Sequence, residues 1–320
     1  MDSAVVQAQQ LVEKIINNVE KVIIGKHTTV QLAVIALISQ GHLLIEDAPG
    51  VGKTMLARSL AKSINCTFKR IQFTPDMLPG DITGVSVYNQ KTVDFEFRPG
   101  PVIAQVVLAD EINRATPKVQ SALLECMEER QITVDGTTYK MPSPFHIFAT
   151  QNPVEYEGTF PLPETQLDRF LLRISLGYPS TSDEMTIIER QQYTHPIEQL
   201  GSVIEASEVL TLQETVKKIY VDDLIKQYIV SLVDATRHHP SIYLGSSPRG
   251  SLALFRTAQS RALMEGRDYV LPDDVKALVE PVLSHRIKLI AASTSQDGSA
   301  RTCLADILDT LPVPGVPHDQ

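Results

Sequence analysis

The feature that most constrains this chain is a glycine-containing loop at residues 46–54, read together with an apolar strand and two carboxylates at residues 106–111. The loop, Glu-Asp-Ala-Pro-Gly-Val-Gly-Lys-Thr, follows a short apolar run at residues 42–46 and precedes apolar residues at helical spacing. A strand that passes through glycines into a helix presents backbone N–H groups and the positive end of a helix dipole to an anion. The sequence therefore predicts a phosphate-binding loop.

The loop also carries side chains suited to a nucleoside triphosphate. We expect Lys53 to reach the β- and γ-phosphates and the hydroxyl of Thr54 to hold Mg²⁺. The full pattern begins with glycine, but this chain has Asp47 there, while Gly50 and Gly52 keep the tight part of the turn unrestricted. Asp tolerates left-handed backbone, so little strain is expected. The predicted nucleotide contacts of the loop, besides Lys53 and Thr54, are Pro49, Gly50, Val51, Gly52 and Met55.

The second motif completes the prediction. Residues 106–109 form a continuous apolar run, which is typical of a parallel strand buried on both faces. Asp110 at its end is expected to hold the Mg²⁺ water shell, and Glu111 to orient and deprotonate the attacking water. An acidic loop can follow any strand, but the spacing from Lys53 leaves room for the helix and strand that the fold requires. The two motifs together predict a triphosphatase that uses ATP and Mg²⁺.

Composition bounds the remaining classes. A chain of 320 residues with 43% hydrophobic residues can build two domains with real cores. Its net charge of −9 and pI near 5.4 argue against a general nucleic-acid binder. The most basic stretches, His238-His239 and residues 285–288, are interpreted as helix ends exposed to solvent. The three cysteines lack metal-ligand spacing, so we expect buried thiols in a reducing compartment. No apolar stretch is long enough to span a membrane, which predicts a cytoplasmic protein.

Three segments are expected along the chain. Residues 1–180 alternate strand and helix patterns and form the nucleotide-binding core, with β-hairpins predicted near residues 85–97 and around Asp135-Gly136. Residues 181–292 are expected to be helical and free of strands. Residues 293–320 turn polar and then rich in proline, so a loosely attached tail is expected.

This arrangement resembles the MoxR branch of the AAA+ ATPases over roughly residues 22–290. The resemblance rests on residues 44–54, 95–101, 108–115, 149–153 (Ala-Thr-Gln-Asn-Pro), 167–170 (Leu-Asp-Arg-Phe) and 247–249 (Ser-Pro-Arg). It implies an α/β P-loop AAA+ core of αβα type with a parallel sheet, followed by an all-α lid. The two hairpins match the helix-2 insert and the hairpin before sensor 1, and both would face the pore of a ring. An acidic residue at position 47 is similar to what this branch carries.

The resemblance also implies residue roles. Asn152 matches the sensor-1 residue, whose amide binds the γ-phosphate and the lytic water. Arg169 matches the arginine finger, which reaches the ATP of the neighbouring subunit and suits the charge of a phosphoryl-transfer transition state. Arg249 matches the sensor-2 arginine, which couples the lid to the γ-phosphate in its own or a neighbouring subunit. Val22, Ile23 and Gly25 fall where the family contacts adenine.

Simpler interpretations stay open for several of these residues. Asn152 before proline is an ordinary turn residue, and Arg249 after Ser-Pro is an ordinary helix-start residue. Arg169 could pair with Asp168 or Glu164 at the surface. The hairpin aromatics Tyr88, Phe95 and Phe97 could grip a client or pack the hairpin.

The resemblance implies a hexameric ring that hydrolyses ATP and remodels or matures a protein partner. That partner would carry a von Willebrand factor A domain, and the work could be metal or cofactor insertion or complex assembly. Two alternatives stay open: an ATPase subunit of a magnesium-chelatase-like complex, and a nucleotide-gated scaffold with little turnover. A nucleic-acid motor is disfavoured by the acidic balance.

Overall fold

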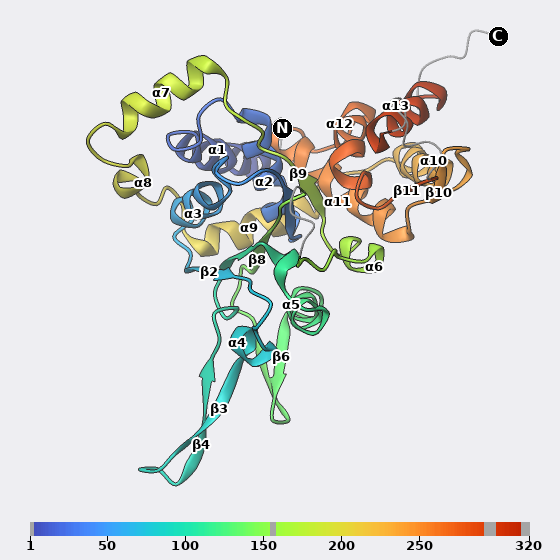
Figure 1. Cartoon of the computed structure of the whole chain (residues 1–320). Coiled ribbons are helices and arrows are strands. Elements are labelled where there is room, and N and C mark those ends of the chain that lie inside the picture. Colours follow the sequence, from blue (N-terminus) through green and yellow to red (C-terminus); the bar gives the residue numbers. More distant parts are fainter. Residues whose placement is uncertain (1–2, 154–157, 291–298, 315–320) are drawn as a thin grey trace, which may run out of the picture.

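The computed structural model describes residues 3–153, 158–290 and 299–314, and it has three parts (Figure 1). An α/β core lies at the centre, a helical lid packs beside it, and two β-hairpins project from the core. The parallel sheet, the hairpins and the lid confirm the predicted P-loop AAA+ fold class.

The core sheet has the strand order β2-β5-β8-β1-β9, and every neighbouring pair is parallel. The strands are β1 (Leu43–Glu46), β2 (Phe68–Gln72), β5 (Val106–Asp110), β8 (His146–Gln151) and β9 (Leu172–Ile174). Parallel pairing places the carboxyl ends of all strands along one side of the sheet, which we call the carboxyl edge. The amino ends of the strands lie along the opposite side, the amino edge. This polarity decides which side chains can meet.

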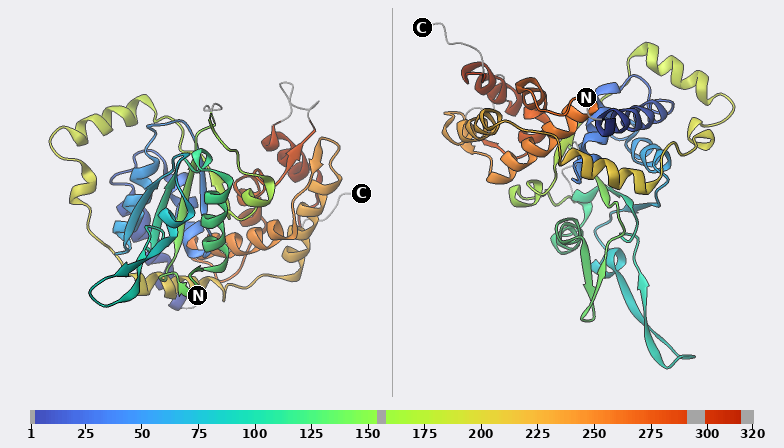
Figure 2. Two further views of the ribbon diagram at one scale, coloured as in Figure 1. Left: turned by 60° about the horizontal axis from the view of Figure 1, so that its bottom comes forward. Right: turned by 180° about the vertical axis from the view of Figure 1, so that it is seen from behind.

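Side chains alternate between the two faces of each strand, and helices cover both faces. Leu43 and Ile45 pack in the hydrophobic cluster that includes α1 (Ser3–Val19), α2 (His27–Ile38) and α3 (Lys53–Ser63). Leu44 points the other way, into the cluster that includes α5 (Pro117–Glu129). Figure 2 shows the blue helices and α5 on opposite sides of the sheet.

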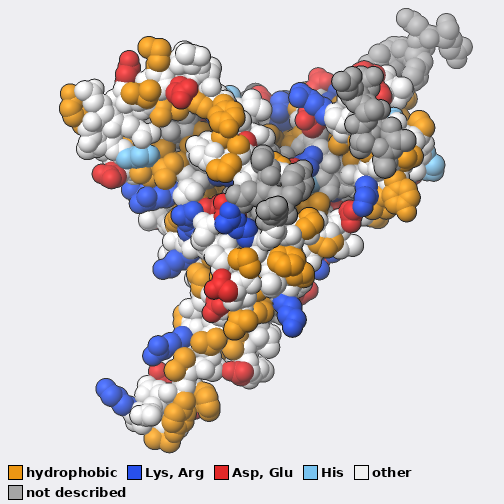
Figure 3. All heavy atoms as spheres, in the orientation of Figure 1, with side chains coloured by type: hydrophobic (Ala, Val, Ile, Leu, Met, Phe, Trp, Pro, Cys, Tyr) orange, Lys and Arg blue, Asp and Glu red, His pale blue; other side chains and the backbone are white. Residues whose placement is uncertain are grey.

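The two hairpins project in the same direction from the core (Figure 1). The longer hairpin pairs β3 (Gly84–Asn89) with β4 (Asp94–Pro99) and follows the short helix α4 (Pro79–Thr83); the shorter one pairs β6 (Gln131–Val134) with β7 (Thr137–Lys140). Phe97 stacks on Tyr139 with 4.0 Å between ring centroids, so this aromatic joins the two hairpins. Tyr88 and Phe95 meet edge to face but stay exposed near the tip, where Figure 3 shows hydrophobic side chains.

The lid follows a connection that runs along the core on the side of α1, α2 and α3. This connection contains α7 (Thr181–Gln191), α8 (Pro196–Gln199) and α9 (Ala206–Val216). The lid then forms from α10 (Asp223–His238), α11 (Pro248–Met264), α12 (Pro272–Leu283) and α13 (Ala300–Thr310). No residue of α7 is buried, whereas α11 and α12 each bury a long apolar face.

Two expectations for this half of the chain are wrong. It contains two short paired strands, β10 (Ile242–Leu244) and β11 (Lys288–Leu289). The expected tail is helical over α13, which buries Cys303, Leu304 and Ile307 against α10 and α12. The segment was predicted to be a tail because its composition is polar, although one face of the helix is apolar. Residues 293–298 and 315–320 of the expected tail lie outside the described part. No helix among the described residues is long and apolar enough to cross a membrane.

Two buried histidines join β1, β8 and the end of α5. Nδ1 of His42 accepts a hydrogen bond from the Ile147 N–H (3.0 Å), so Nε2 carries the proton and donates to the Met127 carbonyl (3.1 Å). His146 donates from Nδ1 to the Gly41 carbonyl (2.7 Å). Burial, together with the neighbouring His146 and Arg130, lowers the pKa of His42 to about 3. Burial also lowers the pKa of His146 to about 4. Both rings are therefore neutral in the folded protein at neutral pH.

We predict that stability falls as the pH drops below about 6.5. The unfolded chain protonates these histidines near their ordinary pKa, whereas the folded chain resists protonation until about pH 4 to 3. Each ring then costs about 1.4 kcal/mol per pH unit within that window. Denaturant unfolding between pH 4.5 and 7.5 measures the slope. His146→Asn, which keeps a donor for Gly41, should make the slope shallower, and His238→Asn on the exposed face of α10 should not. Equal slopes in all three proteins would contradict the assignment.

Candidate functional site

The phosphate-binding loop lies between β1 and α3, at the carboxyl edge of the sheet. Gly50 and Gly52 have positive φ (83° and 99°), a conformation that L side chains rarely adopt. Helix α3 begins at Lys53. The Lys53 side-chain amine donates a 2.7 Å hydrogen bond to the carbonyl of Asp47 at the start of the loop. Burial lowers the pKa of Lys53, while the charges of Asp110, Asp47 and Glu111 oppose that shift. The Lys53 amine therefore lies among the carboxylates of Asp47, Asp110 and Glu111, whose charges favour its protonated form.

Asp47, which replaces the first glycine of the pattern, ties the loop to the end of β9. One carboxylate oxygen accepts bonds from the N–H groups of Leu176 (2.7 Å) and Gly177 (2.6 Å) and from the Ser175 hydroxyl (2.8 Å). The other oxygen accepts from the Ala48 N–H (2.8 Å). Partial burial would raise the pKa of Asp47, but these four hydrogen bonds outweigh it and lower the pKa. The departure from the glycine pattern is therefore a structural tether.

Asp110 ends β5 at the same edge. Its Oδ1 accepts a 2.6 Å hydrogen bond from the Thr150 hydroxyl, and its Oδ2 accepts from Nη2 (2.6 Å) and Nε (3.0 Å) of Arg70. The side chain is therefore held by β8 and β2, the two strands that flank β5. Two-sided fixing keeps the carboxylate in one orientation at the strand end.

Glu111 turns away from the strand with a positive φ of 58°. Its N–H donates to the Thr150 hydroxyl (2.8 Å), and its carboxylate accepts from Gln72 (2.7 Å) and pairs with Arg114 (3.1 Å). Arg114 belongs to the 3-10 turn Ile112–Arg114, so the turn that follows β5 also orients the predicted base. A left-handed non-glycine residue at such a position is a feature of functional sites.

The sensor and adenine candidates fall at the same edge. Asn152 directly follows β8, is buried, and accepts at its carbonyl from Asn113 (3.5 Å). Residues 22–25, which contain Val22, Ile23 and Gly25, are covered by the start of α7: a Cβ at Gly25 would lie 2.2 Å from the Asp183 carboxylate. Lys26 donates to the Tyr178 carbonyl (2.8 Å), one residue beyond the Gly177 that binds Asp47. The residue after the predicted adenine segment, Lys26, and the phosphate-binding loop, through Asp47, are therefore both hydrogen-bonded to residues 177–178.

The two predicted arginines meet on one carboxylate at the end of α5. Arg169 follows the short helix α6 (Glu164–Leu167) and pairs with Oε2 of Glu128 at 3.2 Å. Arg249, the second residue of α11, binds the other oxygen of Glu128. Arg169 therefore pairs with neither expected partner, Asp168 nor Glu164. The Arg169 Nε is buried and has no hydrogen-bond partner among the described residues.

This arginine pair lies at the opposite edge of the sheet from the phosphate-binding loop. The cleft around it, of about 280 Å³, is lined by Gly41 and His42, which precede β1, whereas Lys53 follows β1. A four-residue strand such as β1 is about 13 Å long. The cleft's charged lining is Arg130, Arg169, Arg249, Arg256 and Arg286 with Glu128 and Asp168. Its excess of cations suits an anion.

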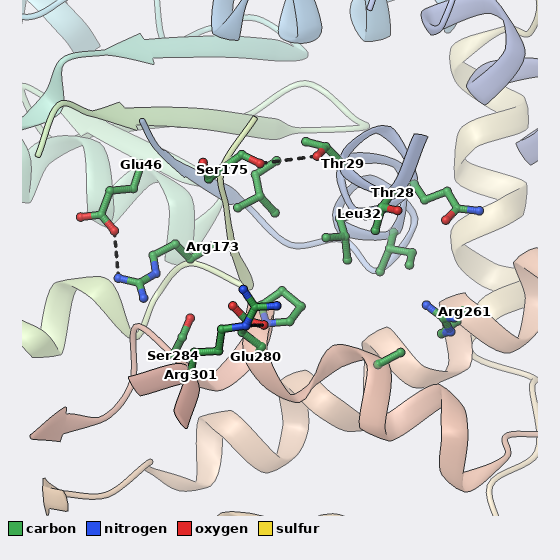
Figure 4. A pocket seen from close by; sticks show the side chains of 15 residues that line it. Thr28, Thr29, Leu32, Glu46, Arg173, Ser175, Arg261, Glu280, Ser284 and Arg301 are labelled. Carbon is green, nitrogen blue, oxygen red and sulfur yellow. Dashed lines mark hydrogen bonds and ion pairs between the residues drawn. The ribbon is translucent and has the colours of Figure 1, made fainter. Parts of the chain in front are cut away.

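A separate cavity of about 530 Å³ lies beside β9, between α2 and the lid (Figure 4). In it Arg173 pairs with Glu46 at 2.9 Å, and the Thr29 hydroxyl donates to the Ser175 carbonyl at 3.5 Å. Its lining includes Glu46 but none of the loop residues 47–54. Its role in the site is indirect, because Ser175 also binds Asp47.

Sequence reasoning missed several residues of the site. Thr150 could have been found, because it lies on β8 two residues before Asn152, which directly follows that strand. Arg70 and Glu128 carry no local signal, since their partners come from other elements. The stretch 285–288 was wrongly interpreted as solvent-exposed: His285 and Arg286 are buried between lid and core. Charged residues near a helix end are exposed by default, and only tertiary contacts reverse that expectation.

Comparisons with known proteins agree with this geometry. Residues 42–172 match the model of the "ATPase family associated with various cellular activities (AAA)", and residues 234–307 match the "AAA lid domain" model. The chain is 52% identical to "Uncharacterized protein YeaC" of Bacillus subtilis, covering 95% of each chain. It is 42% identical to "Chaperone MoxR1" of Mycobacterium tuberculosis, over 95% of this chain and 82% of the other. A crystal structure of a Cytophaga hutchinsonii protein assigned as an ATPase is 37% identical with a TM-score of 0.91, covering 98% and 97% of the chains.

We predict that Asp47→Ala lowers both stability and nucleotide affinity. The change leaves the N–H groups of Leu176 and Gly177 without their acceptor and frees the loop from β9. Partly buried donors without partners cost about 1–3 kcal/mol. Denaturant unfolding measures the stability, and titration with a fluorescent ATP analogue measures the affinity. Asp94→Ala is the matched control, because Asp94 accepts only from the next residue's N–H on the exposed hairpin. Equal effects of the two changes would contradict the tether.

Proposed function

The chain belongs to the MoxR family of AAA+ ATPases, and on this premise we propose that it hydrolyses ATP as a ring and uses the energy to remodel or mature a protein partner. The observation that carries the proposal is the placement of Arg169 and Arg249 together on Glu128, one strand length from their own phosphate-binding loop. Groups at that edge complete the site of a neighbouring subunit.

The carboxyl edge of the sheet supplies the hydrolytic chemistry. Lys53 and the N–H groups at the start of α3 bind the phosphates. Glu111, oriented by Gln72 and Arg114, takes the proton of the attacking water as the water oxygen bonds to the γ-phosphorus. The bond from that phosphorus to the β–γ bridging oxygen breaks, and the bridging oxygen leaves with ADP. Asn152 positions that water from the neighbouring strand end. The proposed products are ADP and phosphate.

The residues at this edge fit a magnesium ion that arrives with the nucleotide. Mg²⁺ prefers oxygen ligands and is usually held by one or two protein groups, water and phosphates. Thr54 and Asp110 offer such oxygens, and Arg70 and Thr150 fix the Asp110 carboxylate. Among the described residues, no group of three or more His, Cys, Asp or Glu could hold a metal by itself. When bound, the ion neutralises phosphate charge.

A neighbour's γ-phosphate suits the arginine pair for electrostatic reasons. Two guanidinium groups side by side repel each other, and in the isolated chain Glu128 compensates them. The Arg169 Nε, which lacks an acceptor among the described residues, would gain one from a phosphate oxygen. We therefore assign Arg249, like Arg169, to the neighbour's nucleotide. A ring of six subunits is what the family resemblance implies.

The partner is proposed to dock on the hairpin side of the ring. Tyr88, Val93 and Phe95 are exposed on the longer hairpin, where an apolar cluster needs cover. A von Willebrand factor A domain protein is the partner that the resemblance implies. Loss of ATP-dependent co-purification with such a protein in the Phe95→Ser variant would support this surface, and full retention would count against it.

We predict that the ATPase rate per subunit climbs with protein concentration and that Arg169→Ala is inactive at every concentration. Fingers of this kind contribute roughly 10³–10⁵ in rate. Glu111→Gln should be inactive as well, while both variants still bind ATP. The measurement is phosphate release against protein concentration at saturating ATP and Mg²⁺.

Arg301→Ala is the control, because Arg301 pairs with Glu280 within the lid. It should behave like the unchanged protein. A flat rate per subunit that is insensitive to Arg169→Ala would refute the trans-acting finger. ATP binding with no turnover above Glu111→Gln would favour a nucleotide-gated scaffold instead.

A further inference from the structure

Arg286, at the end of α12 in the lid, reaches into the core instead of into solvent. Its side chain is 3% exposed, and its Nε pairs with Oδ1 of Asp168 at 2.9 Å. Its terminal nitrogens donate to the carbonyls of Phe170 (2.6 Å) and Leu171 (3.1 Å) in the core. The same guanidinium also donates to the Val282 carbonyl in the last turn of α12, the helix that precedes Arg286. One lid side chain thus binds the backbone on both sides of Arg169.

Asp168 receives a second bond from the lid. Its Oδ2 accepts from the Ser247 hydroxyl at 2.8 Å, and Ser247 caps α11 by accepting from the Arg249 N–H at 3.1 Å. Asp168 therefore connects the end of α12 to the start of α11. Each predicted arginine lies close in sequence to one of these two residues. Arg169 directly follows Asp168, and Arg249 lies two residues after Ser247.

The other side of the segment is held by the sheet. The Leu171 N–H donates to the His42 carbonyl at 2.8 Å, just before β9 pairs with β1. Residues 168–171 thus lie between the amino end of the sheet and the lid guanidinium. Since α6 and the lid helices are adjacent (Figure 1), movement of the lid would carry this segment with it.

We infer that Arg286 is a positioning residue for ATP hydrolysis in the neighbouring subunit. It fixes the backbone that carries Arg169 and, through Asp168 and Ser247, places Arg249 beside it, so that the two arginines move as one unit with the lid. This inference rests on the proposed function, because it requires that Arg169 act on a neighbour's nucleotide. Arg286 itself touches no reacting group.

The chemistry of the contact requires arginine. The planar guanidinium has five donors in a fixed fork, and here they reach a carboxylate and three carbonyls at once. The ammonium of lysine has three donors around one point and cannot span these acceptors. A lysine at position 286 would therefore keep a positive charge beside Asp168 but lose the hydrogen bonds to the carbonyls of Phe170 and Leu171.

The test is Arg286→Lys in the full-length protein, at a concentration where the rate per subunit no longer rises. We expect kcat to fall roughly 10²-fold, as for a small misplacement of a catalytic group, while KM and binding of ATP stay unchanged because the P-loop is intact. Mixing with Glu111→Gln subunits should restore activity above the sum of the parts. Those subunits cannot hydrolyse ATP but present an intact finger to the Arg286→Lys neighbour.

Arg267→Lys is the matched control. Arg267 forms a partly buried bidentate pair with the buried Asp274 (2.6 and 2.8 Å) inside the lid. It should lose similar thermal stability with no loss of kcat. Should Arg286→Lys fail to fold, Ser247→Ala decides the question. It removes the second bond to Asp168 and the cap of α11 but leaves Arg286 in place, so it should lower kcat several-fold, again with mixing rescue.

The outcomes separate the two proposals. Wild-type kcat in Arg286→Lys, or a loss that mixing does not rescue, would overturn the positioning role while Arg169→Ala remained inactive. Normal turnover by Arg169→Ala would instead overturn the proposed function on which the inference rests.

Discussion

The hydrogen-bond ladder between β1 and its two parallel neighbours, β8 and β9, is the constraint on which the functional groups depend. Because the pairing is parallel, everything that follows a strand meets at one edge and everything that precedes a strand meets at the other. The loop with Lys53, the Asp110–Glu111 pair and Asn152 follow their strands. Arg169 precedes β9. One sheet thus separates the groups proposed to bind the chain's own nucleotide from the groups proposed to act on a neighbour's nucleotide.

Compensated charge holds both edges in place. At the carboxyl edge, Asp110 is bound by Arg70 and Thr150, and Asp47 by three backbone N–H groups and a hydroxyl. At the amino edge, Glu128 is shared between two arginines, and Arg286 shares Asp168 with Ser247. Burial lowers the pKa of Arg286 to about 10, although Asp168 opposes the shift, so it stays charged at neutral pH. A buried charge without a partner would be costly, so each network selects one geometry.

The sequence predicted the nucleotide-binding motifs better than the residues that hold those motifs in place. Glycines, an apolar strand and a lysine–threonine pair carry local signals, so the phosphate-binding loop and the Asp110 strand could be recognised. Asp47 looked like a departure from the pattern, and its purpose emerged only with its partners at residues 175–177. The stretch 285–288 looked like a solvated helix end, and the residues after 299 looked like a tail. Both predictions failed because burial of these segments depends on elements far away in sequence.

By itself, the sequence determined the fold class and pointed to the residues proposed to bind the nucleotide. These expectations follow from local patterns: hydrophobic period, glycine placement and short motifs, which act over a few residues. Arg169 and Arg249 were singled out only by the resemblance to the MoxR branch. The tertiary structure alone decided that Arg169 and Arg249 share Glu128, that Arg286 holds the backbone beside Arg169, and that both arginines lie away from Lys53. Those facts depend on how the lid packs against the core, and that packing is set by long-range contacts between buried side chains, which no single segment encodes.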